Sequence, residues 1–182
     1  MNAPVTMRFQ GRCWVFGDNI DTDRIAPGKY LNMTDPKDHA AHVLEGVDPD
    51  FPKKVRPGDI VVAGRNFGCG SSRERAPSGI KAAGIRVVIA ASFARIFLRN
   101  SINIGLPLLE CAELQPHVAE GDVLDVDLAA GTIANTRTGR LLAAKPFPPF
   151  LQGLIAAGGL IPYARVRLQQ RGSPSRGAPD GV

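Results

Sequence analysis

The chain has 182 residues, 44% of them hydrophobic, which suits a single globular domain and excludes a chain that is disordered throughout. Much of its net charge of +5 lies after residue 164, where the chain has four arginines and one aspartate. Only 6% of its residues are aromatic, so there is no basic and aromatic surface that could stack bases, and we expect no nucleic-acid partner. Since no apolar run approaches the ~20 residues that span a bilayer and residues 1–10 lack the pattern of a secretory signal, we expect no membrane partner and a cytoplasmic location.

The N-terminal third combines one short strand with loops. Residues 12–16 are predicted to form a strand that enters a loop rich in Asp and Asn over residues 17–25. A helix is predicted over residues 35–45, with Asp35 as its N-cap and a proline at its first position. Residues 47–58 contain three prolines and are predicted to be irregular.

The middle of the chain alternates buried strands with helices. The apolar runs 60–63 and 85–90 predict strands, and residues 76–83 between them predict a helix. Ser92 is expected to cap a second helix, which a strand over residues 106–110 follows. This alternation is typical of an α/β fold with parallel strands.

The C-terminal part changes character. Residues 123–128 and 132–135 flank a glycine turn and predict an antiparallel hairpin. A helix is predicted over residues 150–157 and ends at a glycine pair. Residues 165–182 are basic and rich in Gly, Pro, Ser and Arg, and from residue 169 onward they predict a disordered tail.

The three cysteines do not predict a metal site. Cys13, Cys69 and Cys111 are far apart and form no C-x-x-C pair. A zinc site, an iron–sulfur site and a disulfide framework are therefore not expected, and no cofactor-binding residue is assigned to this chain.

A glycine-rich loop, Gly-Arg-Asn-Phe-Gly-Cys-Gly-Ser-Ser-Arg-Glu-Arg, follows the strand at 60–63 and occupies residues 64–75. The spacing of Ser71 and Glu74 predicts a capping box at the start of the next helix. Two hydroxyls and an arginine at a helix N-terminus suit a carboxylate or a phosphate. The alternatives are an ordinary structural turn and a phosphate- or nucleotide-binding module, although neither the dinucleotide fingerprint nor a P-loop is complete.

This loop resembles the signature of the small, swivelling domain of the aconitase superfamily, in particular of the small subunits of 3-isopropylmalate dehydratase and homoaconitase. The resemblance extends over about residues 12–163 and is carried by Gly68–Glu74, by Gly-Asp-Asn-Ile-Asp-Thr-Asp-Arg-Ile at 17–25, by the start of a specificity loop at 27–31, and by residues 88–97 and 99–107. It implies a swivelling β/β/α domain over residues 1–164, a mixed parallel and antiparallel sheet with flanking helices, followed by the basic tail 165–182.

The resemblance also implies a reaction and its residues. Members remove water from a hydroxy-dicarboxylate and add it back with the opposite regiochemistry, as in the isomerisation of 2-isopropylmalate to 3-isopropylmalate in leucine biosynthesis. It places the catalytic base on Ser71, with Ser72 and Arg73 on a substrate carboxylate. Thr22 is expected to bind substrate beside the serine loop, and Asp23 to orient catalytic groups in the cleft; a simple Asx turn is the alternative for Asp23. A regulatory subunit without catalytic residues is a further alternative.

The resemblance places a [4Fe-4S] cluster on a separate large subunit, so this chain is expected to be inactive alone and to work in a heterodimer or heterotetramer. Asn32 and Met33 follow the specificity motif and are expected to contact the substrate. An apolar Met33 without a neighbouring cation favours isopropylmalate. Homoaconitate and citramalate- or dimethylmalate-type acids are alternatives, because Arg24 could replace the missing cation.

Overall fold

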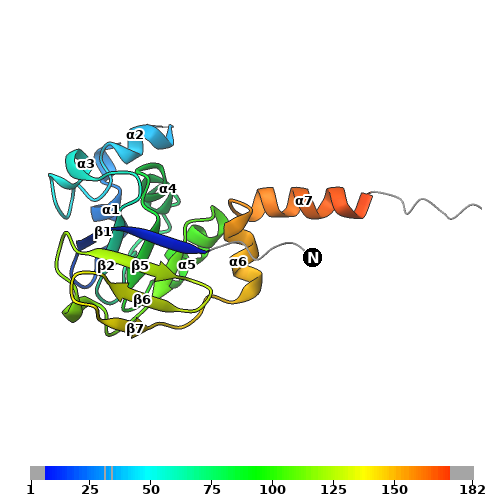
Figure 1. The fold of residues 1–182 in the computed structure, drawn as a ribbon. Coiled ribbons are helices and arrows are strands. Elements are labelled where there is room, and N and C mark those ends of the chain that lie inside the picture. Colours follow the sequence, from blue (N-terminus) through cyan, green and yellow to red (C-terminus); the bar gives the residue numbers. More distant parts are fainter. Residues whose placement is uncertain (1–6, 31, 34, 173–182) are drawn as a thin grey trace, which may run out of the picture.

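A seven-stranded mixed sheet with the order β4-β3-β2-β1-β5-β6-β7 organises the structure, a computed structural model that describes residues 7–172 except 31 and 34 (Figure 1). The strands are β1 (Arg8–Val15), β2 (Ile60–Ala63), β3 (Val87–Ala90), β4 (Leu108–Glu110), β5 (Val123–Asp127), β6 (Thr132–Asn135) and β7 (Leu141–Ala143). Strands β1 to β4 pair in parallel, and β1, β5, β6 and β7 pair antiparallel. The mixed sheet predicted from the sequence is confirmed.

Strand β1 belongs to both halves of this sheet. Its first part pairs with β5, with Arg12 opposite Val123, and its last part pairs with β2, with Cys13 opposite Ile60. All residues of β2 and β3 are buried, which explains their unbroken apolar sequences, because parallel strands are covered on both faces. The hairpin strand β5 alternates exposed and buried residues instead.

The helices cover the parallel half and extend beyond one end of the sheet (Figure 1). They are α1 (Thr22–Ile25), α2 (Pro36–Ala40), α3 (Phe51–Lys54), α4 (Arg75–Ala82), α5 (Arg95–Asn103), α6 (Pro149–Ala156) and α7 (Leu160–Gly172), with the 3₁₀ helices η1 (Gly28–Tyr30) and η2 (Gln115–His117). The core beside α4 and α5 contains Phe51, Phe67 and Phe97, each almost without solvent exposure. Burying side chains of this size contributes roughly 1.5–3 kcal/mol each.

Several predicted elements differ in the structure. The helix expected over 35–45 ends at Ala40 and continues as turns, since Leu44 adopts a positive φ of 59°. The segment 47–58 includes α3, which buries Phe51. Ser92 does not cap α5, because its hydroxyl accepts a hydrogen bond from the Asn66 backbone N–H (2.9 Å) and Ala94 occupies the cap position.

The C-terminal helix α7 continues past the predicted boundary at residue 164 and reaches Gly172. The first part of the predicted tail is therefore helical, while residues 173–182 lie outside the described residues. Among the residues that the structure describes, no helix is both long and apolar enough to cross a membrane.

Candidate functional site

Three loops meet at the carboxyl ends of the parallel strands. They follow β1, β2 and β3, and ligand sites of α/β sheets form at this edge. The Gly68 N–H donates to the Ile20 carbonyl (2.7 Å), and the Thr22 N–H donates to the Cys69 carbonyl (2.8 Å). The Phe67 N–H donates to the Ser92 carbonyl (3.0 Å). These bonds bring the two sequence motifs, residues 17–25 and 64–75, side by side.

Two glycines make this arrangement possible. Gly68 and Gly70 have φ angles of 77° and 93°, in the left-handed region that other residues rarely adopt. A Cβ atom on Gly68 would lie 2.2 Å from a ring carbon of Phe97, and one on Gly70 would lie 3.3 Å from the Thr22 hydroxyl. The first glycine therefore lets the loop pack on α5, and the second lets Thr22 approach the serines.

Four of the predicted site residues form one cluster. The Thr22 hydroxyl is buried; it donates to the Ser71 carbonyl (3.0 Å) and lies 3.3 Å from the Ser71 hydroxyl. The Arg73 Nε donates to the Ser71 Oγ (3.1 Å). The Arg73 Nη2 forms an ion pair with Asp23, and its Nη1 donates to the Ala26 carbonyl (3.0 Å). Ser71 itself is exposed, so its hydroxyl oxygen is accessible to a ligand.

The hydrogen-bond directions define what this cluster can do. A carbonyl oxygen only accepts, so the Thr22 proton is committed to the Ser71 carbonyl, and the Ser71 proton is free to point at the Thr22 oxygen. The Ser71 oxygen therefore faces a guanidinium that is always charged. A positive charge at this distance favours the anionic form of a hydroxyl. The geometry thus suits a serine that works as a base.

The predicted capping box is wrong. Helix α4 begins at Arg75, and Glu74 occupies its N-cap position with helical backbone angles and no side-chain cap bond. Ser71 lies before this position, and its hydroxyl is engaged by Arg73 and Thr22 instead. The positive charge at the site comes from the Arg73 guanidinium rather than from a serine-capped helix end.

The other predicted residues lie at the edge of this cluster or away from it. Ser72 is exposed, and its side chain has no hydrogen-bond partner among the described residues. Asn32 is exposed, and the half-buried Met33 accepts at its carbonyl from the His39 ring (2.9 Å) when Nε2 carries the proton. Neither side chain forms a hydrogen bond to the cluster within the described part of the chain. Leu31 and Thr34, which flank these two residues in the chain, lie outside the described residues.

A second polar cluster holds the segment that leads to Asn32, and sequence patterns did not predict it. The Glu45 carboxylate accepts from Lys29 (2.7 Å), from the Tyr30 hydroxyl (3.0 Å) and from His42 Nδ1 (2.9 Å) when that nitrogen is protonated. The Tyr30 and His42 rings stack with their centroids 3.6 Å apart. Hydrogen bonds from Lys29, and next from His42, lower the pKa of Glu45 to about 2. No local pattern links these residues, because the turn after α2 brings them together.

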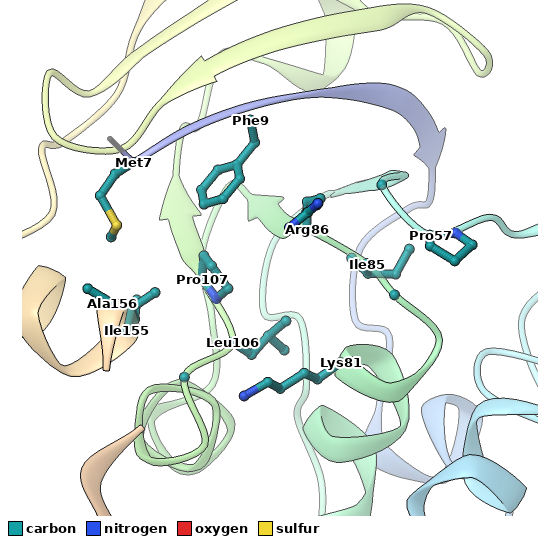
Figure 2. A pocket seen from close by; sticks show the side chains of 13 residues that line it. Met7, Phe9, Pro57, Lys81, Ile85, Arg86, Leu106, Pro107, Ile155 and Ala156 are labelled. Carbon is teal, nitrogen blue, oxygen red and sulfur yellow. The ribbon is translucent and has the colours of Figure 1, made fainter. Parts of the chain in front are cut away.

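A hollow of about 450 Å³ lies at the opposite edge of the sheet, where the parallel strands begin. Figure 2 shows Lys81 and Arg86 there among mainly apolar side chains. The Lys81 ammonium donates to the carbonyls of Ile104 and Gly158, and burial lowers its pKa. No residue of the two motif loops, 17–25 and 64–75, lines this hollow. We place the candidate site at the motif loops, because the polar groups converge there and not in the hollow.

Comparisons with known proteins show which family this chain resembles. Residues 16–114 match the family described as aconitase C-terminal domain. Over 162 residues the chain is 57% identical to a 3-isopropylmalate dehydratase small subunit of Thermodesulfovibrio yellowstonii, covering 89% of this chain and 96% of that protein. It is 55% identical over 161 residues to an isopropylmalate/citramalate isomerase small subunit of Methanocaldococcus jannaschii, covering 88% and 96%. A crystal structure of a 3-isopropylmalate dehydratase from the same organism matches with a TM-score of 0.86 at 43% identity, covering 91% and 99%.

Proposed function

Because the chain belongs to the family of 3-isopropylmalate dehydratase small subunits, we propose that it supplies the proton-abstracting half of a hydro-lyase that interconverts 2-isopropylmalate and 3-isopropylmalate in leucine biosynthesis. The observation that carries this proposal is the contact between the Arg73 guanidinium and the exposed Ser71 hydroxyl (3.1 Å). In an active site shared between two subunits, the base must lie on an exposed surface, because the partner subunit has to present the substrate to it.

In the proposed reaction Ser71, after losing its proton to solvent, takes a proton from the carbon beside a substrate carboxylate. The electron pair moves onto that carboxylate and forms the carbon–carbon double bond when the neighbouring hydroxyl leaves and takes up a proton from solvent to become water. Addition of water in the other orientation, with return of the proton from Ser71 to carbon, completes the isomerisation. Arg73 stabilises the Ser71 alkoxide, Thr22 holds the serine loop through its bond to the Ser71 carbonyl, and Asp23 and the Ala26 carbonyl hold the guanidinium in position. Ser72 and the remaining N–H groups of Arg73 are the donors proposed for the substrate carboxylate.

The cysteines support the assignment of the [4Fe-4S] cluster to the large subunit. Cluster ligands are thiolates, whereas burial raises the pKa of Cys13 to about 11 and also raises that of Cys111. Within the described residues, no group of three His, Cys, Asp or Glu side chains is arranged to hold a metal ion. The chain therefore does not fit the cluster, and we propose that it is inactive until it joins the large subunit in a heterodimer or heterotetramer.

Free cysteines also fit the reducing cytoplasm that we propose as its location.

Isopropylmalate is the substrate that the specificity segment favours. Met33 offers adaptable apolar surface beside Asn32, and no cation stands at these positions. Arg24, the candidate cation for a third carboxylate, is exposed and donates its Nε to the Gly46 carbonyl (3.3 Å), so homoaconitate is kept as an alternative substrate. Citramalate is the second candidate, because the relative from Methanocaldococcus jannaschii is named an isopropylmalate/citramalate isomerase small subunit.

The test is a hydratase assay after anaerobic reconstitution with the large subunit. Isopropylmalate, citramalate, homoaconitate and dimethylmalate would be compared, with each subunit alone as a control. We expect turnover only in the complex, strongest with isopropylmalate. Activity of this chain alone would contradict the two-subunit proposal, and stronger turnover of another acid would replace the proposed substrate.

The role of Ser71 is tested in the same complex. We expect Ser71→Ala to lower kcat by on the order of 100-fold or more, as removal of a general base does. Ser72→Ala is the matched control, a neighbouring hydroxyl expected to raise KM more than it lowers kcat. Full activity of Ser71→Ala would support a regulatory subunit instead.

A further inference from the structure

Exposed apolar side chains gather on α5 and on the last two helices, α6 and α7. Six of the large apolar side chains that the structure exposes lie on α5, α6 and α7, namely Ile96, Phe150, Leu160, Ile161, Val166 and Leu168. On α7, Leu160, Ile161, Ala164 and Leu168 share one side of the helix, because residues three and four positions apart are neighbours. We call these four residues the apolar face of α7.

This apolar face is open to solvent. Leu160 is 44% exposed, Ile161 72% and Leu168 70%. In Figure 1 the helix projects away from the sheet. Its Tyr163 ring packs against Phe150 of α6 (5.9 Å between centroids), and this contact lies at the beginning of the helix. Such an unpartnered apolar face on a projecting helix is typical of a surface that another chain covers.

The apolar face is continuous with the candidate site. A hollow of about 250 Å³ joins the end of the motif loop to the start of α7 and is lined by Glu74, Asn100, Asn103, Ile104, Leu160 and Ile161. Glu74 follows Arg73 directly in the chain. A chain that reaches Ser71 and Arg73 from solvent therefore meets the beginning of α7 along the same surface.

The charges beside this surface distinguish between possible occupants. Helices α5 and α7 contain arginines, and none of α5, α6 and α7 contains Asp or Glu. Arg95 and Arg99 line the adjoining hollow between α5 and Leu160, and Arg165 and Arg167 lie on α7 itself. Pairing two copies of this surface would bring arginines against arginines, which is unfavourable. An apolar strip edged by carboxylates on a different chain is complementary to it.

We propose that the apolar face of α7 is a docking arm for the large subunit, which binds it through an apolar strip flanked by acidic residues. The proposal rests on the proposed function, because it takes the large subunit as the chain that also meets Ser71. The motif loops offer mainly polar groups, so α7 would supply the apolar area that a stable subunit contact needs.

The test compares the full-length Ile161→Asp/Leu168→Asp variant with the wild-type chain. Binding to the cluster-loaded large subunit would be measured by sedimentation. It would also be measured from the activity of a fixed amount of large subunit as this chain is added. Since two exposed aliphatic side chains would lose their burial, we expect affinity to fall by at least about 30-fold, with kcat at saturation unchanged. Wild-type affinity would also fall as salt rises, because the arginines contribute to it.

Two controls keep the outcome clear. Leu141→Asp changes a side chain that is 67% exposed on the edge strand β7 and is expected to leave affinity unchanged. Ser71→Ala is expected to lose kcat while keeping affinity, so that failure of the reaction and failure of docking are distinguishable. Wild-type affinity in the double variant would overturn the proposal. The proposal would also be overturned if the isolated wild-type chain self-associates and the double variant loses this self-association but still binds the large subunit with unchanged affinity. A second copy of the chain would then be the occupant of the apolar face.

Discussion

Arg73 connects the groups of the candidate site, because its three nitrogens contact three different acceptors. Nε contacts the proposed base Ser71, Nη2 pairs with Asp23 and Nη1 contacts the Ala26 carbonyl. The planar guanidinium fixes the angles between these contacts, which a lysine would not do. The orientation of the positive charge toward Ser71 therefore depends on Asp23, a residue that touches neither the base nor, in our proposal, the reacting carbon.

We expect Asp23→Asn to lower kcat/KM of the assembled enzyme by roughly 10-fold, because the amide no longer holds the guanidinium by charge. The free energy of unfolding should change by less than about 1 kcal/mol, since the Asp23 side chain is 63% exposed. Steady-state kinetics and denaturant unfolding measure the two effects. Asp18→Asn, which alters the exposed pair of Asp18 with Arg65, is the matched control. Equal losses of activity in both variants would contradict a specific role for Asp23.

At the scale of residues, the family motifs predicted which residues come together in the site. The spacing of these residues in the sequence did not predict which hydrogen bonds they form. Thr22, Asp23, Ser71 and Arg73 were all assigned to the site from their motifs, and the structure brings them together. The capping-box pattern failed because it considers only partners within one turn. The Thr22 hydroxyl, 49 residues away in sequence, lies beside the Ser71 hydroxyl instead.

Among the elements, the 3₁₀ helix η1 depends on a contact distant in sequence. Lys29 and Tyr30 both bind Glu45, so the carboxylate joins η1 to the turns that follow α2. The segment that leads to Asn32 and Met33 begins at η1, and its position therefore depends on the charge of Glu45.

This dependence predicts a change of stability in acid. The pKa of Glu45 is about 2 in the folded chain and 4.5 ordinarily. Its contribution to stability is therefore present above about pH 4.5 and is lost as the pH falls toward 2. We expect a loss on the order of 1 kcal/mol over this window that Glu45→Gln does not show, measured by urea unfolding at several pH values. Glu120→Gln, at an exposed position, should keep the wild-type pH dependence.

Strong local patterns predicted elements well, and weak ones did not. The apolar runs of β2 and β3 and the glycine turn between β5 and β6 identified these strands, because burial on both faces and a tight turn leave clear patterns. The three-residue strand β7 is too short to show a period. Helix α7 was assigned to the tail from residue 165 onward, because the Gly, Pro, Ser and Arg content of residues 165–182 is typical of disorder and outweighed the helical spacing of its few apolar residues.

In the whole molecule, Asp122 joins the two halves of the sheet. Its carbonyl accepts from the Cys13 N–H of β1 (2.8 Å), and its carboxylate accepts from the Asn135 amide of β6 (2.7 Å) and from Arg137. The Arg137 guanidinium is the main cause of a lowered pKa at Asp122. Since Asn135 is 1% exposed, its amide has little access to water as a replacement partner.

We expect Asp122→Ala to lower the free energy of unfolding by about 2–4 kcal/mol, because it leaves the nearby Ala119 N–H and one N–H of the buried Asn135 amide without an acceptor, while the other Asn135 N–H keeps the His117 carbonyl. Guanidinium unfolding followed by Trp14 fluorescence measures this, as Trp14 lies in β1. The exposed Asp125 on β5 offers the control, and Asp125→Ala should stay within about 0.5 kcal/mol of the wild type. A similar small effect at Asp122 would show that the halves of the sheet do not depend on it.

The backbone bonds between the two motif loops have a mechanical consequence. The bridge between Asp21 and Cys69 continues the parallel pairing of β1 and β2 beyond the strands themselves. Ser71, Thr22 and Arg73 are thereby attached to the buried parallel strands. A rotation of this domain against the proposed large subunit would therefore move these groups as one body. It would change the gap between the two subunits and leave the spacing of hydroxyl, guanidinium and carboxylate constant.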